Sequence, residues 1–170
     1  FPGANLYSAR VYNSLFTLHG VIMIFLFIIP GLPAVFGNFF LPILLGAKDV
    51  SFPKLNLISF WIYAIGAILL LISLVISPSG PADTGWTVTV PYSVTTETSV
   101  GLALFALFVL GWGTILTAIN FIVTTHRLRA PGMTWYKMPL FIHSLYATSW
   151  IQVLATPVVG ITLLLVALER

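Results

Sequence analysis

Four long apolar stretches alternate with short polar connectors along the chain. The stretches cover residues 15–45, 57–76, 100–124 and 140–168. A helix needs roughly 20 residues to cross the ~30 Å hydrocarbon core of a bilayer, and it satisfies its backbone hydrogen bonds internally. The pattern therefore predicts an all-α membrane protein with four transmembrane helices that form a single unit.

Prolines interrupt the first stretch at Pro30, Pro33 and Pro42. A proline has no backbone N–H, so the carbonyl four residues earlier loses its helical partner. We expect a bent or tilted first helix whose freed carbonyls accept hydrogen bonds from neighbouring helices.

In the middle connector, between the second and third apolar stretches, we expect residues 87–90 to form a short extended piece.

Positive charge is distributed unevenly among the connectors. The middle connector, residues 77–99, has no lysine or arginine, whereas the first and third carry five of the seven basic residues in the chain: Lys48, Lys54, Arg127, Arg129 and Lys137. Basic connectors stay on the inner side of a membrane. We therefore expect these two connectors inside and both ends of the chain on the outer side.

Composition supports lipid as the solvent of this chain. Charged residues make up 6% of it and hydrophobic residues 59%, whereas a soluble domain has roughly 25% charged residues. The net charge of +3 comes without a basic cluster, which disfavours nucleic-acid binding. The absence of cysteine excludes disulfides and cysteine-ligated metal centres. Because the first residue is Phe1, we expect the chain to be processed or one piece of a longer protein.

His19 lies within the first apolar stretch. An ionisable side chain at membrane depth is usually retained for a function. Two interpretations are equally supported by its position: a buried histidine bonded to a neighbouring helix, or a metal or haem ligand. His126 and His143 lie at the opposite end of the spans, so a second axial ligand would come from outside this chain.

A series of polar residues occupies the inner half of the predicted bundle: Asn38, Asp49, Asn56, Ser59, Thr114, Thr117 and Asn120. Such amides and hydroxyls can hold a file of water with a carboxylate at its mouth. They can equally hydrogen-bond across packed helices, and the residues alone favour this second interpretation. Trp86 also has two interpretations. Its indole N–H could donate to an anion such as a haem propionate, or it could be an interfacial aromatic, which is the interpretation that the residue alone favours.

Several motifs follow one another in order: LFTLHGVIMIF at 15–25, FGN at 36–38, PILLGAKDVSFPKLN at 42–56, SFW at 59–61, TGWT at 84–87, NFIVT at 120–124, RAPGM at 129–133 and MPLF at 138–141. Together they resemble the second to fifth transmembrane helices of subunit I of the haem–copper terminal oxidases, which implies that the four helices form part of a twelve-helix bundle. The resemblance extends over nearly the whole chain with few gaps.

The resemblance implies roles for particular residues. His19 matches a ligand of the low-spin haem iron, and Trp86 matches a tryptophan that hydrogen-bonds a propionate of the high-spin haem. Asp49 matches the acid at the entrance of the D proton channel. The remaining matches fall on residues that line that channel: Asn38, Asn56, Ser59 and Asn120.

The resemblance also implies an enzyme, a proton-pumping oxidase that oxidises cytochrome c and reduces oxygen to water. It would contain a low-spin haem, expected to be of the a type, together with a high-spin haem and copper ligated outside this chain. Its partners would be the remaining part of subunit I, the other oxidase subunits and cytochrome c. It would lie in a bacterial plasma membrane or a mitochondrial inner membrane.

Some positions depart from the family pattern. Gly113 and Thr114 replace two serines that many members have along the proton path, and His143 replaces a tryptophan, most simply as a packing substitute. Val11 and Ser14 occupy positions where ubiquinol oxidases carry His and Gln, which favours cytochrome c as donor. A quinol oxidase of the same family and a non-catalytic four-helix scaffold or accessory subunit stay as alternatives.

Overall fold

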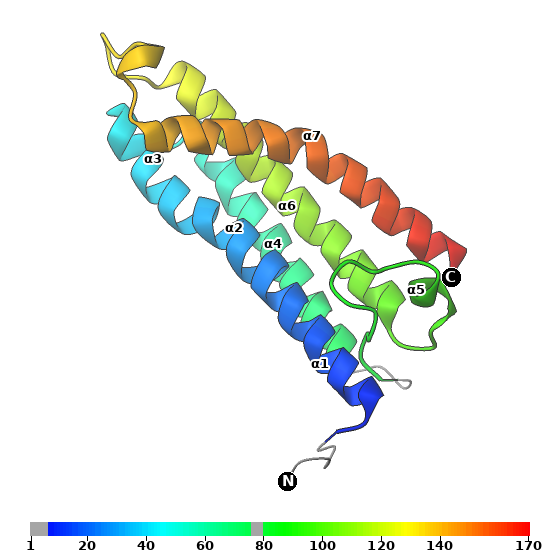
Figure 1. Cartoon of the computed structure of the whole chain (residues 1–170). Helices are drawn as coiled ribbons and strands as arrows, with labels where there is room; N and C mark the ends of the chain where they lie inside the picture. Colours follow the sequence, from blue (N-terminus) through cyan, green and yellow to red (C-terminus); the bar gives the residue numbers. More distant parts are fainter. Residues whose placement is uncertain (1–6, 76–79) are drawn as a thin grey trace.

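The computed structural model describes residues 7–75 and 80–170. The first helix is a continuous rod of five segments, and the others follow in chain order (Figure 1): α1 Ala9–Val21, η1 Ile22–Ile28, α2 Ile29–Gly31, η2 Leu32–Gly37, α3 Asn38–Leu45, α4 Pro53–Val75, α5 Tyr92–Thr95, α6 Val100–Arg127, η3 Trp135–Lys137 and α7 Leu140–Glu169.

Within the described residues, four helices are long and apolar enough to cross a membrane, and their candidate spans are Ala9–Leu45, Pro53–Ser73, Val100–Arg127 and Leu140–Glu169. The prediction of an all-α protein with four spans is therefore confirmed. The first helix begins at Ala9, before the apolar stretch, because the Ser8 hydroxyl accepts a hydrogen bond from the Val11 N–H at 3.3 Å and caps the helix. The predicted end of the second span, at residue 76, lies outside the described residues.

The first helix widens to π-helical spacing in η1 and η2, around Pro30 and Pro33, whereas Pro42 lies inside the α-helical segment α3. Pro30 leaves the carbonyl of Leu26 without a helical N–H, and the Tyr63 hydroxyl of α4 donates to that carbonyl at 2.8 Å. This contact confirms, at Leu26, that a neighbouring helix supplies the missing hydrogen bond.

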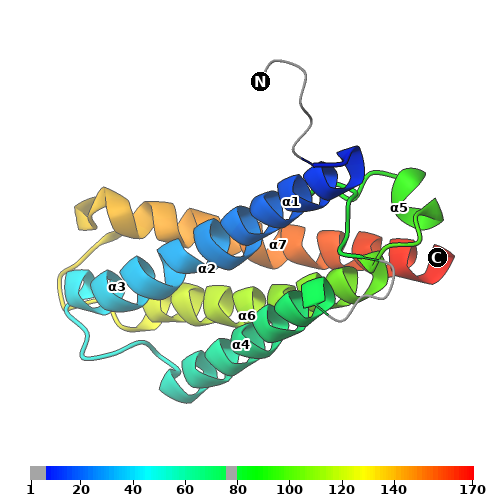
Figure 2. The same ribbon diagram turned by 90° about the horizontal axis from the view of Figure 1, so that it is seen from below.

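The helix α6 is the centre of the bundle. It packs against both α4 and α7, and the first helix lies across them (Figures 1 and 2). The approach of α4 to α6 is close enough that a Cβ atom on Gly113 would lie 3.0 Å from the Ser59 carbonyl oxygen. Glycine at this position therefore allows the backbones to meet, as small residues do in membrane bundles.

The connectors gather at the two ends of the bundle (Figure 1). Residues 46–52 and 128–139 lie at one end, which we call the Asp49 end. Residues 80–99 lie at the other, the Asp83 end, together with the start of α1 and the end of α7. The expectation of an extended piece at residues 87–90 is wrong. The chain turns there, because the Val88 N–H donates to the Gly85 carbonyl at 3.3 Å and Val88 has a φ of 49°.

Candidate functional site

A cavity of about 1020 Å³ lies between the first helix, α4, α6 and α7. Four of the five residues predicted for the polar path line it, and they come from three separate parts of the chain: Asn38, Asp49, Asn56 and Ser59. The hydroxyls of Thr114 and Thr117 on α6 line it as well. The fold thus brings most of the predicted polar series around one space.

Asp49 lies at the mouth of the cavity. Its side chain is exposed at the surface and also belongs to the cavity lining. One carboxylate oxygen accepts a hydrogen bond from the Val50 N–H at 2.7 Å, which fixes its direction. A carboxylate placed in this way can exchange protons with bulk water and present them to the cavity.

Asn120 is placed differently from the other predicted path residues. It is completely buried and, among the described residues, is not part of the cavity lining. Its Oδ1 accepts from the Phe52 N–H at 3.0 Å and its Nδ2 donates to the Phe52 carbonyl at 3.2 Å. Thr124, one turn further along α6, accepts from the Ser51 N–H at 2.9 Å. Asn120 and Thr124 therefore hold the loop that carries Asp49.

Asn38 has an unused acceptor in the cavity wall. Its Nδ2 donates to the Ala34 carbonyl at 3.1 Å, but its Oδ1 is buried and has no partner in the described part of the chain. Buried polar atoms are nearly always hydrogen-bonded, and a cavity of about 1020 Å³ has room for water beside its polar side chains. Water bound in the cavity would satisfy the Asn38 oxygen.

Hydroxyl groups continue the polar lining between α4 and α6. The Thr117 hydroxyl lies 3.1 Å from the Ser59 hydroxyl, and Ser59 donates to the Asn56 carbonyl at 2.7 Å. The contact between Thr117 and Ser59 joins the two helices, as in the helix-packing interpretation, and both residues also line the cavity. The same groups can therefore stabilise the bundle and contact water.

Gln152 of α7 is a lining residue that sequence reasoning missed. Its Nε2 donates to the Thr114 hydroxyl at 2.9 Å across the α6–α7 interface. An amide in the middle of an otherwise apolar span was the available signal, because polar side chains at membrane depth are costly and usually functional.

His19 lies on an exposed face of α1. Its imidazole makes no hydrogen bond within residues 7–75 and 80–170, and its neighbours on this face are large exposed apolar side chains: Tyr12, Leu15, Phe16 and Met23. A free imidazole on an apolar face fits a residue that ligates the iron of a large, flat macrocycle. The described residues contain no group of three or more His, Cys, Asp or Glu side chains that could hold a metal ion.

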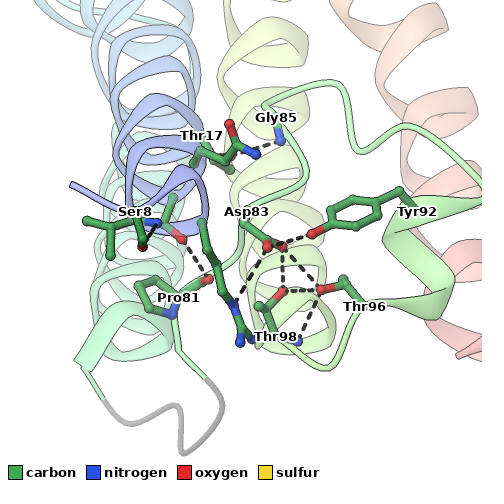
Figure 3. Close-up of polar contacts among 12 residues, drawn as sticks. Ser8, Thr17, Pro81, Asp83, Gly85, Tyr92, Thr96 and Thr98 are labelled. Carbon is green, nitrogen blue, oxygen red and sulfur yellow. Dashed lines mark hydrogen bonds and ion pairs between the residues drawn. The ribbon is translucent and has the colours of Figure 1, made fainter. Parts of the chain in front are cut away.

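Trp86 packs directly on the helix that carries His19. A Cβ atom on Gly20 would lie 2.9 Å from Trp86 Cδ1, so the glycine makes room for the indole. Three residues before Gly20, the Thr17 hydroxyl accepts from the Gly85 N–H at 2.8 Å, and Ser14 donates to the Pro81 carbonyl at 3.3 Å (Figure 3). The middle connector is therefore docked along one face of α1.

Asp83 organises the rest of this connector (Figure 3). Its buried carboxylate accepts from the hydroxyls of Tyr92 at 2.7 Å, Thr98 at 3.0 Å and Thr96 at 3.2 Å. The Arg10 guanidinium lies 4.0 Å away and supplies a positive charge. The hydrogen bond to Asp83 is the main reason why the pKa of Tyr92 is raised. Arg170 donates to three backbone carbonyls of the same connector: those of Ser93, Thr96 and Thr98.

The other two histidines lie at the Asp49 end, far along the helices from His19. The His126 Nε2 atom lies 2.8 Å from the Tyr146 hydroxyl. His143 packs beside Trp135, with ring centroids 6.4 Å apart, and its Nδ1 lies 3.3 Å from the Pro139 carbonyl oxygen. These contacts are those of packed side chains.

The model of one protein family matches residues 1–170, and its description is cytochrome c and quinol oxidase polypeptide I. Two similar proteins are named as cytochrome c oxidase subunit 1-beta. The one from Nocardia farcinica is 42% identical over 175 residues, and the one from Streptomyces avermitilis is 39% identical over 173. Each alignment covers 99% of this chain and 29% or 30% of the relative, so the chain spans less than a third of their length.

Proposed function

The chain belongs to the cytochrome c and quinol oxidase polypeptide I family, and from this membership we propose that it is part of the catalytic subunit of a proton-pumping terminal oxidase. That enzyme would oxidise cytochrome c and reduce oxygen to water. The names of the relatives and the absence of His and Gln at Val11 and Ser14 favour cytochrome c over quinol.

In this proposal, His19 ligates the low-spin haem through a neutral ring nitrogen. Its exposed, hydrogen-bond-free imidazole on an apolar face of α1 supports the assignment. The haem, when bound, would accept and pass on single electrons. Trp86 would donate its indole N–H to a propionate of the high-spin haem, and its docking beside Gly20 supports this role. We expect the high-spin haem and copper to be ligated by the rest of the subunit.

The single observation that carries the proton path is the cavity that begins at Asp49. Protons would enter at this carboxylate and move along water held by Asn38, Asn56 and Ser59. Asn120 would contribute by holding the loop of Asp49 against α6. A partner-free acceptor on Asn38 supports the presence of that water.

The proposed orientation places the Asp49 end inside. The basic residues Lys48, Lys54 and Arg127 at this end support it. Both ends of the chain would then lie on the outer, positive side of a bacterial plasma membrane or mitochondrial inner membrane. Proton uptake from the inside and electron entry near the outside would together charge the membrane.

Replacing Asp49 tests the path in the assembled oxidase. Asp49→Asn removes the exchangeable proton and leaves the hydrogen bond to Val50 in place, so we expect proton uptake during oxygen reduction to slow at least tenfold. The haem spectrum should not change. Glu97→Gln is the matched control, because Glu97 is an exposed acid at the opposite end. Unchanged proton uptake in Asp49→Asn would refute the entrance assignment.

A further inference from the structure

Gln152 marks the end of the cavity that is farthest from Asp49 along α7. The lining residues of this helix run from Phe141 to Gln152, and Gln152 lies roughly 18 Å from the start of the helix at a rise of 1.5 Å per residue. An amide at this depth is unfavourable unless its polar atoms find partners.

The hydrogen bonds of Thr114 fix how this amide is oriented. The Thr114 hydroxyl donates its single proton to the Gly111 carbonyl at 2.8 Å. The group that faces the Thr114 oxygen at 2.9 Å must therefore be the N–H of Gln152. The Gln152 Oε1 atom makes no hydrogen bond within the described chain, which leaves an acceptor available in the cavity wall.

The other polar groups that line the cavity near this end are hydroxyls, among them those of Tyr63 and Thr148. The Tyr63 hydroxyl donates to the Leu26 carbonyl. Gly113 adds no polar group, and a Cβ atom there would crowd α4, at 3.0 Å from the Ser59 carbonyl oxygen and 3.3 Å from the Tyr63 nitrogen. Beside the hydroxyl oxygens, Gln152 therefore supplies the one amide oxygen that the described residues place at this depth of the cavity.

We propose that Gln152 is a positioning residue that binds the last water of the file at the end away from Asp49. This inference rests on the proposed proton path. Gln152 accepts a hydrogen bond from that water and is never protonated itself. Each water takes a proton from the Asp49 side and releases one on the other side, so the file returns to its starting charge.

The test compares variants of the assembled oxidase during the reaction of the reduced enzyme with oxygen. Gln152→Met keeps the length of the side chain and removes both polar groups. We expect proton uptake to slow about tenfold, as for the loss of one hydrogen bond to the transferring water. Electron transfer from the donor to the low-spin haem and the haem spectrum should stay unchanged, which a loss of packing alone would not produce.

Thr162→Val is the matched control on the same helix, since the Thr162 hydroxyl bonds only to the Val159 carbonyl of its own turn. If Gln152→Met fails to assemble, Thr114→Val tests the inference in its place. This variant removes the hydroxyl that accepts from the Gln152 amide and leaves Gln152 present. We expect slower proton uptake there too. Proton uptake at the wild-type rate in the assembled Gln152 variant, or in Thr114→Val when it is used instead, would overturn the inference.

Asp49→Asn separates this inference from the proposed function. Slow uptake in Asp49→Asn with normal uptake in Gln152→Met would overturn the role of Gln152 and retain the path. Normal uptake in Asp49→Asn with slow uptake in Gln152→Met would refute the entrance and support Gln152. Normal uptake in both would overturn both.

Discussion

Two asparagines of the predicted path use their amides in opposite ways. The Oδ1 atom of Asn38 has no partner among the described residues and lies in the cavity wall. In Asn120, by contrast, both Oδ1 and Nδ2 are hydrogen-bonded to the backbone of Phe52. The residue type is the same, and the difference comes from what each side chain faces. Asn38 faces a space, and Asn120 faces a loop whose Phe52 N–H and carbonyl both point at its amide.

His19 is the residue on which the haem assignment depends. His19→Ala removes the proposed axial nitrogen, so the oxidase should lose the absorbance of its low-spin haem. An optical spectrum of the purified complex measures this. His143→Phe is the control, because His143 packs against Trp135 at the other end and should leave the spectrum unchanged. A wild-type spectrum in His19→Ala would contradict the assignment.

At the scale of elements, the loop of residues 46–52 is held to α6 by side chains. Asn120→Ala leaves the Phe52 N–H without its partner, whereas the Phe52 carbonyl keeps its hydrogen bond from the Asn56 N–H at 3.1 Å, so we expect the assembled protein to be destabilised by about 1 kcal/mol. Thermal unfolding in detergent measures this change.

The same variant should slow proton uptake, because Asp49 loses its fixed position. Thr124→Val acts on the neighbouring Ser51 N–H and should have effects in the same direction. Normal stability together with slow uptake in Asn120→Ala would instead make Asn120 a direct contact of the water file.

The connector that carries Trp86 depends on Asp83 and Tyr92. The hydrogen bond to Asp83 raises the pKa of Tyr92 above its usual value of 10.0, so the folded connector favours the protonated phenol. This stabilisation is fully present below pH 10 and is lost as the pH rises through the raised value. Wild-type protein and Tyr92→Phe should therefore differ in thermal midpoint at pH 8 and converge at higher pH. An equal difference at all pH values would contradict this account.

The sequence predicted the spans well because hydropathy measures the property that lipid selects. It also placed Asn38, Asp49, Asn56 and Ser59 in one half of the bundle, where they line one cavity. It could not predict the hydrogen bonds between Asn120 and the backbone of Phe52 or the hydrogen bond from Gln152 to Thr114. Each joins segments far apart in the chain, and its partner depends on how α6 packs against a loop or α7.

At the scale of the whole molecule, the exposed surface is strongly apolar. Large side chains such as Phe27, Phe39 and Leu154 are 70%, 62% and 68% exposed. A surface of this kind suits lipid and further helices of a larger bundle. This agrees with a chain that spans less than a third of its relatives' length.

Oxygen-driven proton release by the assembled oxidase tests the central claim most directly. The complex that contains this chain would be placed in closed vesicles and given reduced cytochrome c. We predict oxygen consumption with acidification of the medium outside the vesicles, both absent without the electron donor. A complex without haem absorbance or oxygen consumption would contradict the account and leave a non-catalytic membrane scaffold.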